Sequence, residues 1–519
     1  MKLENYNEIS EYKEKLDLRR AVHLLRRIGF HPSIDQLKQI IGKTPQEAFS
    51  LIVGSSNELP EPSNSMKNWL NKLEEDPLDN LPLEIRFEIE GRLRSRYNEF
   101  INWWLDLMKN ENFPYKEKFT LFLSSIWNIE FTYDTLALIP PPLLYRNNQT
   151  LRRLRFASYK QIAEEITLDG SMLLYQSLFY SSKRGPNENF MRELLELFTM
   201  GIADLETGKA NYTEGDIREG SRVLTGWRTV AYLGQEGAPA NRPFETFFAA
   251  QHHDTSGKKL FQYGEILPIS NDDNNEDLVK EKEVKGLIDI IFKWRGNSIA
   301  KFISDKILRF YLYSNPAASN INIINQFANT MIENDYQLLP VYQKLFTSEL
   351  FYDDDFIGCQ IKSPVEFIIG LERILDYDFD NISNGKTRSY LNSLEQVLYD
   401  PPNVSGWKGY RNWINTNTYP LRVKYAVEII NNIPRKKIVD NFSKLGKYQN
   451  FDNFFDDFLI YLMPKELPNP RKIEIKSILL GNYLENDWIS KLNNKDEELG
   501  ENIRKALLRL VVTPDFQLC

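Results

Sequence analysis

Apolar side chains recur every three or four residues along most of the chain, the spacing that predicts amphipathic helices. One such segment, 16–29, is followed by Ser33-Ile34-Asp35-Gln36, whose Ser and Gln predict a capping box at the start of the next helix. Further helices are expected over four segments: 84–108, 116–131, 279–375 and the stretch beyond 420. The pattern therefore predicts a mainly α-helical protein.

Three segments interrupt this helical pattern. Residues 54–82 are rich in Ser, Asn, Pro and Glu and are expected to form an exposed connection. Residues 229–282 mix Gly, Pro, Asn and aromatic side chains with short β-favouring pieces, and long excursions of this kind are usually functional or disordered. Residues 400–420 form an irregular loop rich in Pro, Gly, Trp and Asn. We therefore expect a multi-helix globular protein with a small irregular or β excursion around 229–270.

The length of the chain predicts more than one packed unit. Its 519 residues exceed the roughly 250–300 residues that a single hydrophobic core usually serves. Hydrophobic side chains make up 42% of the chain, which is enough to build large cores. We expect three regions: an N-terminal helical region over 1–150, a central helical region over 151–400 with the motif-bearing pocket and the long insertion, and a C-terminal region over 401–519 with an aromatic loop and helices.

Charge and cysteine content narrow the classes of function. The net charge of −8 argues against general nucleic-acid binding, which depends on neutralised phosphates. The local basic groups Arg152, Arg153 and Arg155 are expected to form a solvated helix face rather than a phosphate site. Cys359 and Cys519 make no disulfide framework and fit a reducing compartment. The N-terminus is polar and no run reaches the roughly 18 apolar residues of a membrane span, so a cytoplasmic protein is expected.

The segment from Asn187 to Gly201 is the most informative part of the chain. Asn187 marks a helix start and Gly201 fits the helix end. Between them, Glu188, Arg192 and Glu196 recur every fourth residue and share one polar face. A charged stripe inside an apolar segment indicates a lined pocket. The alternative is an ordinary stripe of intrahelical ion pairs, worth only tenths of a kcal/mol per pair.

Histidine is scarce, so its positions are informative. His23 and His31 are expected to have structural roles, whereas His253-Asp254 lies in the long polar excursion. A neighbouring His and Asp can bind a metal or share a proton, although such a pair in a loop is often a simple turn. The helix carboxylates of Glu188, Glu193 and Glu196 could join His253 and Asp254 around a divalent cation, with His253, Asp254 and Glu188 as the metal ligands.

The loop over 400–416 concentrates prolines, aromatic residues and Asn, including Trp407 and Trp413. A rigid aromatic loop of this kind could line a pocket or bind a carbohydrate or a peptide, and a structural corner stabilised by Trp packing is the alternative. The sequence contains no Gly-rich phosphate loop, no zinc-type Cys cluster and no Ser nucleophile elbow, which disfavours the corresponding reactions.

Several ordered blocks resemble the bacterial domain-of-unknown-function family 1800, and together they cover nearly the whole chain. The blocks are Leu24–Phe30, Asn187–Gly201, Tyr212-Thr213-Glu214 with Leu224–Trp227, His253-Asp254 with Lys259, Phe302-Ile303 with Lys306, Ser363–Phe367, Pro401–Trp407 and Thr513–Gln517. The resemblance implies a bacterial protein whose relatives are often exported and often encoded beside a sulfatase-like family. It implies no particular reaction, but it suggests the sulfatase-like protein as a partner.

The chain departs from the family pattern at histidine positions. Many relatives carry Trp-His-Asn-His-Phe after a Leu-Phe pair, whereas here a gapless match places Ser124 and Ile126 at the two histidines. An alignment that starts from Trp127 places Asn128 and Glu130 there instead. Phe198, which lies in the helix of the Asn187–Gly201 block, stands at a further position that is often His in relatives. These changes weaken any metal site that depends on those histidines.

Two hypotheses follow. In the first, the protein is an enzyme in which His253 is an acid/base or a metal ligand, Asp254 orients it, Glu188 and Glu196 are ligands or proton acceptors, and Arg192 fixes an anionic group. In the second, which the lost histidines favour, it is a non-catalytic or specialised partner or scaffold protein, and an aromatic surface holds another protein. The candidate ligand- or partner-binding residues are Asn187, Asn189, Trp227, Lys259, Trp407 and Trp413.

Overall fold

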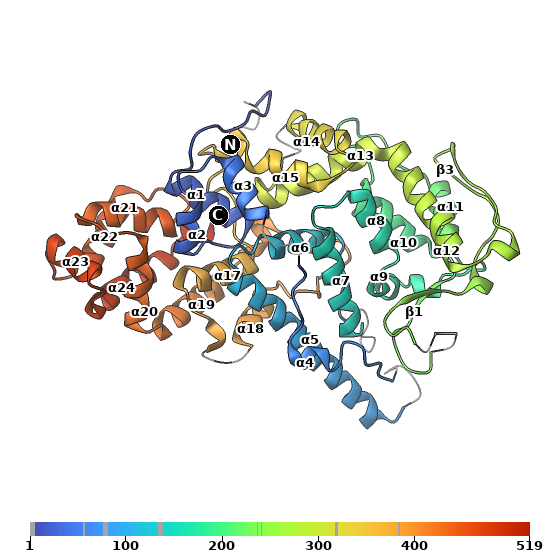
Figure 1. The fold of residues 1–519 in the computed structure, drawn as a ribbon, viewed down its shortest axis with the longest axis horizontal. Helices are drawn as coiled ribbons and strands as arrows, with labels where there is room; N and C mark the ends of the chain where they lie inside the picture. The colour runs from blue at the N-terminus through green and yellow to red at the C-terminus, as the bar shows by residue number, and fades with distance from the viewer. Residues whose placement is uncertain are drawn as a thin grey trace.

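The fold is mainly α-helical, as the sequence predicts (Figure 1). Two small antiparallel sheets of two strands each accompany the helices in the described part of the chain, and both lie in the expected excursion around 229–270. The computed structural model describes residues 6–54, 58–75, 81–132, 139–235, 237–239, 241–316, 320–381, 383 and 385–519. None of the described helices is both long and apolar enough to span a membrane.

The N-terminal part begins with short capped helices and continues with a long one. Ser33 and Gln36 form the predicted capping box, in which the Gln36 N–H donates to Ser33 Oγ and the Ser33 N–H donates to Gln36 Oε1. Asn128 ends α6 because its side chain donates to the Ser125 carbonyl, so this helix stops before the predicted residue 131. The helices are α1 (Leu18–Ile28), α2 (Ile34–Ile40), α3 (Pro45–Val53), α4 (Asn64–Lys67), α5 (Leu83–Asn110) and α6 (Tyr115–Ile126).

Two expectations for this part need correction. Within the segment expected to be an exposed connection, Met66 and Trp69 are buried, and Trp69 Nε1 donates to Glu99 of α5 at 2.9 Å. The apolar face predicted for α5 is buried from Ile89 onwards, but Phe87 is 61% exposed. The reason is that the N-terminal end of α5 projects from the body of the molecule, beyond the helices that cover the rest of it (Figure 1).

A buried ion pair joins α6 to α7 (Pro141–Leu154). Arg152 donates to Glu117 through Nε at 2.9 Å and Nη2 at 2.6 Å, and both side chains are fully buried. Trp104 Nε1 of α5 donates to the same carboxylate at 2.7 Å. The expected solvated helix face is therefore wrong for Arg152 and for Arg155, which is 3% exposed, whereas Arg153 lies at the surface. The carboxylate on the facing helix is what draws the Arg152 guanidinium inward.

The central part carries the motif helix and the two sheets. Trp227 of β1 pairs with Phe248 of β2, and Lys258 of β3 pairs with Ile266 of β4. The elements are α7 (Pro141–Leu154), α8 (Tyr159–Thr167), α9 (Gly170–Tyr175), α10 (Glu188–Glu193), the π-helix η3 (Leu194–Thr199), α11 (Glu214–Val223), β1 (Trp227–Thr229), β2 (Thr246–Phe248), β3 (Lys258–Leu260), β4 (Gly264–Ile266), α12 (Glu276–Val279) and the π-helix η6 (Lys280–Val284).

The remaining helices complete the body of the molecule. They are α13 (Lys285–Tyr311), α14 (Ile321–Glu333), α15 (Leu338–Phe346), α16 (Glu349–Tyr352), α17 (Pro364–Leu375), α18 (Lys386–Ser393), α19 (Thr418–Asn432), α20 (Arg435–Phe442), α21 (Phe451–Leu462), α22 (Asn469–Leu480), α23 (Glu485–Asn493) and α24 (Gly500–Val511). Short 3₁₀ turns lie between helices, of which η4 (Ala250–His252) and η8 (Tyr410–Trp413) adjoin candidate site residues.

Segments distant in sequence share one hydrophobic core. The Tyr12 N–H donates to the Thr347 carbonyl at 2.8 Å, and the Cys519 N–H donates to the Gln360 carbonyl at 2.8 Å. Helix α1 also packs against α21, so the N-terminal and C-terminal parts meet in the left half of Figure 1. The division into three regions at 150 and 400 stays a prediction.

Candidate functional site

The motif helix starts and ends as the sequence predicts. The Asn187 side chain accepts the Phe190 N–H at 3.0 Å, and Gly201 adopts a φ of +76° that suits glycine. After Glu193 the helix widens into the π-helix η3, a distortion often found at functional sites. Phe198 is completely buried and stacks on Trp127 with ring centroids 4.7 Å apart. The position that is often histidine in relatives is therefore part of the core here.

The polar face of this helix forms a surface network with α11. Arg192 donates to both carboxylate oxygens of Glu214, at 2.9 and 2.7 Å, and lies 3.9 Å from Glu196. The Tyr212 hydroxyl donates to Glu196. Glu188 is exposed, as is its neighbour Asn189. The spacing that suggested a lined pocket thus produces an ion-pair stripe at the surface, to which the first turn of α11 contributes.

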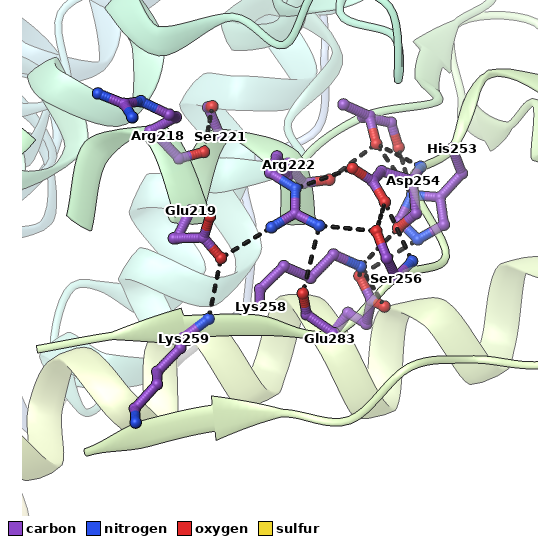
Figure 2. A network of polar contacts seen from close by, with 12 residues as sticks. Arg218, Glu219, Ser221, Arg222, His253, Asp254, Ser256, Lys258, Lys259 and Glu283 are labelled. Atoms are coloured by element: carbon purple, nitrogen blue, oxygen red, sulfur yellow. Dashed lines mark hydrogen bonds and ion pairs between the residues drawn. The ribbon is translucent and has the colours of Figure 1, made fainter. Parts of the chain in front are cut away.

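His253 lies in a second, buried network (Figure 2). Its side chain is inaccessible to solvent, and Nδ1 donates to the Thr225 carbonyl at 2.9 Å. Its Nε2 lies 3.2 Å from Glu283 Oε2, without hydrogen-bond geometry. Lys258 donates to both oxygens of Glu283, at 2.6 and 2.7 Å, and to the Asp254 carbonyl at 2.5 Å. Burial lowers the pKa of Lys258, and the Glu283 carboxylate opposes this.

Asp254 points away from this buried pair and towards Arg222 (Figure 2). Its Oδ2 accepts from Arg222 Nε at 2.8 Å, and its Oδ1 accepts the Ser256 N–H at 3.0 Å. Burial acts to raise the pKa of Asp254, but the Arg222 and Ser256 hydrogen bonds outweigh it and hold that pKa well below its usual range. Arg222 also donates to Glu219, which accepts the backbone N–H of Lys259 at 3.1 Å. Asp254 therefore ties the excursion to the end of α11.

Trp227 and the glycine before it bring two of the family blocks together. Trp227 is 1% exposed and packs on Phe248, which in turn packs edge-on against His253 at 5.2 Å. Gly226 has a φ of +87°, and a Cβ there would lie 3.2 Å from His253 Cβ and 3.1 Å from the Ala249 carbonyl. The Leu224–Trp227 block is therefore the surface on which the His253-Asp254 turn is packed.

The candidate residues thus belong to two networks at opposite ends of α11. Glu214 in its first turn receives Arg192, and Arg222 in its last turn receives Asp254. Eight residues of helix separate these positions by about 12 Å along the axis. His253 and Asp254 contact Glu283 and Arg222, and no contact joins them to Glu188 among the described residues. Within the same residues, no group of three or more His, Cys, Asp and Glu side chains could hold a metal ion.

Sequence reasoning missed the residues that complete the buried network. Glu283 lies in the charged run Glu281-Lys282-Glu283, which reads as a solvated face, yet its side chain is fully buried. Lys258 precedes Lys259, the residue named by the family block, and faces inward because β3 alternates its side chains. Arg222 carried no signal in the sequence. The pairing of Glu283 with Lys258 crosses from η6 to β3.

The aromatic loop lines a pocket of about 230 Å³. Trp407 and Trp413 are half-buried and contribute to its wall, together with residues of α6, α13 and the start of α17. Gly406, with a φ of +77°, lets the loop lie against Asn128, since a Cβ there would be 2.5 Å from Asn128 Nδ2. Ile126, which the gapless match to the family pattern places at one of the two histidines, also lines this pocket. Several family blocks therefore converge here as well as at His253.

These features define a mainly helical protein whose long excursion is held in place by a buried polar network. The chain belongs to the family described as "Protein of unknown function (DUF1800)", because the model of that family matches residues 23–518. This match confirms the family indicated by the sequence blocks. Neither a curated protein nor a solved structure matches the chain.

A second cavity, of about 490 Å³, contains a buried carboxyl group with a shifted pKa. Glu372 is 2% exposed, accepts from the Tyr425 hydroxyl at 2.7 Å and lies 3.9 Å from Lys109. Lys109 is held more closely by Asp378 at 2.9 Å and Asp380 at 3.3 Å. Burial raises the pKa of Glu372 to about 8, although Lys109 opposes the shift.

This shift predicts a pH dependence of stability. Because the pKa of Glu372 is raised above 4.5, its contribution to stability is fully present below about pH 4.5 and is lost as the pH rises through 8. Glu372→Gln keeps the neutral form at every pH. In the wild type, ionisation of Glu372 lowers the unfolding free energy between pH 5 and pH 8. We expect Glu372→Gln to make this decrease smaller by a few kcal/mol, in order of magnitude. Urea unfolding across this range measures the effect, with the exposed Glu497→Gln as control. An unchanged pH dependence in Glu372→Gln would contradict the assignment.

Proposed function

We propose that this protein acts as a non-catalytic scaffold or specialised partner protein rather than as a metalloenzyme. The observation that carries the proposal is the enclosure of His253, Lys258 and Glu283, whose side chains are all inaccessible to solvent. An acid/base residue has to come within hydrogen-bond reach of the substrate proton, and within the described residues these groups reach one another, the Thr225 hydroxyl and the surrounding backbone. Their role under this proposal is to lock the excursion onto α11 and η6.

The alternative enzyme requires His253, Asp254 and Glu188 to act on one substrate or one cation. The Asp254 carboxylate is already paired with Arg222. Glu188 is exposed to solvent, on the helix that carries the other network. Arg192, assigned to an anionic group in that hypothesis, is paired with Glu214. These contacts favour the scaffold. Its partner would be another protein, for which the family resemblance suggests the sulfatase-like protein often encoded nearby.

Elemental metal analysis of the purified protein tests this proposal. We expect no stoichiometric metal in the wild type or in His253→Ala, under several loading conditions. Near-stoichiometric metal that is lost in His253→Ala would overturn the proposal. A structural role makes a second, positive prediction. His253→Ala should lower the unfolding free energy by about 1–3 kcal/mol because it leaves buried polar groups unpaired, while the exposed neighbour substitution His252→Ala should stay within about 0.5 kcal/mol.

A further inference from the structure

The pocket beside the aromatic loop is built from four segments that are distant in sequence. Helix α6 supplies the apolar floor, the end of α13 supplies Lys306 and Arg309, and the start of α17 supplies Glu366. The loop that includes η8 closes it with Trp407 and Lys408. Its volume of about 230 Å³ is below the 300–1,000 Å³ typical of sites for drug-sized ligands, so it suits a small ligand.

Two ammonium groups that line this pocket lack an ion-pair partner. Among the described residues, neither Lys306 nor Lys408 has a hydrogen-bond acceptor or a carboxylate within ion-pair distance, and Lys306 Nζ lies over the Phe302 ring at 4.7 Å. Three other cations of α13 have carboxylate partners: Lys285, Lys301 and Arg309, the last paired with Asp305 at 2.5 Å. Burial lowers the pKa of Lys306 to about 8; the nearby Asp305 carboxylate opposes this shift and Arg309 adds to it.

Glu366, the one carboxylate among the described residues that line the pocket, is neutralised from the interior. Glu366 accepts from Lys118, which is fully buried, and lies 3.7 Å from Arg27. Burial acts against ionisation, but these two cations outweigh it and lower the pKa of Glu366 to about 2. Near the start of α17, the Val365 N–H is already bound by Gln396 Oε1. The uncompensated charge that faces the pocket is therefore positive.

The aromatic side of the pocket adds a second kind of recognition. Trp407 and Trp413 line the same pocket as the two ammonium groups, as does Tyr410 of η8, which is 40% exposed. Trp407 Nε1 is buried and has no hydrogen-bond acceptor in the described part of the chain. Aromatic faces stack on planar rings, while ammonium and indole N–H groups donate to oxyanions.

We propose that this pocket binds a small ligand in which a carboxylate or a phosphate is attached to a planar ring. The oxyanion lies between Lys306 and Lys408, and the ring packs against Trp407 and Trp413. The anion supplies the ion-pair partner that Lys306 lacks. Its binding therefore offsets the cost of holding the Lys306 ammonium away from water. This site goes beyond the proposed scaffold role and does not depend on the role of the His253 network.

Thermal unfolding in the presence of ring-bearing anions tests the site. The probes are phenyl phosphate and benzoate, with benzamide as the neutral analogue and sodium chloride at matched ionic strength. Because a ligand that binds only the folded state stabilises it, we expect at least one of the two anions to raise the Tm of the wild type by about 2 °C or more at saturation. A response to phenyl phosphate alone assigns a phosphate ligand, and a response to benzoate alone assigns a carboxylate.

Substitutions assign the effect to the pocket. Lys306→Met should abolish the response to anions while leaving the Tm without ligand unchanged or higher, since an unpaired ammonium is removed. Lys408→Ala, in the exposed loop, should reduce the response without affecting folding. The matched control is Lys293→Met, an exposed residue of the same helix, which should respond like the wild type. The proposal would be overturned if the wild type responds to neither anion. It would also be overturned if Lys306→Met and Lys408→Ala respond as strongly as the wild type. Either result would leave the scaffold role unaffected.

Discussion

Replacing Glu283 with alanine is expected to destabilise the protein by about 3–5 kcal/mol, because it leaves the Lys258 ammonium buried without its counter-charge. Both oxygens of Glu283 accept from Lys258, and neither side chain is exposed to solvent. His253, 3.2 Å away, also loses a neighbour. The excursion that carries the two sheets should therefore detach more readily from η6 and α11.

Urea unfolding followed by circular dichroism measures this loss. Glu281→Ala is the control, since Glu281 stands two residues earlier in η6 and forms an exposed ion pair with Lys285 at 2.7 Å. Such surface pairs are worth about 0–1 kcal/mol. The double substitution Glu283→Leu with Lys258→Met removes both charges and should recover most of the stability. A loss below about 1 kcal/mol in Glu283→Ala would show that the buried pair does not stabilise the fold.

The second large effect is expected for Arg152→Ala, again about 3–5 kcal/mol. The substitution leaves the Glu117 carboxylate buried with only Trp104 Nε1 as a donor among the contacts described above, and it removes the stem of a fully buried side chain. The adjacent residue offers a close control. Arg153→Ala removes an exposed pair with Glu165 and should cost less than about 1 kcal/mol.

The same unfolding measurement compares the two arginine variants. Two arginines that are neighbours in sequence should differ by several kcal/mol, because one faces the core and the other faces solvent. Similar losses in Arg152→Ala and Arg153→Ala would contradict the structural distinction. Glu117→Gln keeps the shape of the side chain and isolates the contribution of its charge.

Much of the secondary structure could be predicted because its causes are local. Ser33 and Gln36 cap a helix across three residues, and Asn187 caps another through the Phe190 N–H. Apolar periodicity likewise located the long helices. It was misleading for Phe87, which has the correct spacing but is 61% exposed on the part of α5 that projects from the body of the molecule (Figure 1). Spacing shows which side chains share a face, and only packing decides whether that face is buried.

The candidate site was harder to predict because its partners come from distant segments. The His253-Asp254 pair was recognised as unusual, but Glu283, thirty residues later, lies in a charged run and was not singled out. Arg192 was placed correctly on the polar face of its helix, yet its main partner is Glu214 of α11 rather than a carboxylate of its own helix. Lys306 was one residue of a family block and became notable only through the pocket around it.

The sequence by itself determined the helical class, the positions of the capped helices, the small excursion with its sheets and the family to which the chain belongs. These features depend on hydrogen bonds within a few residues and on the order of motifs along the chain. Tertiary structure alone decided which charges are buried and paired, as Glu283 and Lys258 are, and which face a pocket unpaired, as Lys306 does. The residue type of a charged side chain is the same whether folding leaves it in water or buries it in a core. Its energy differs between the two because of the atoms that folding places around it.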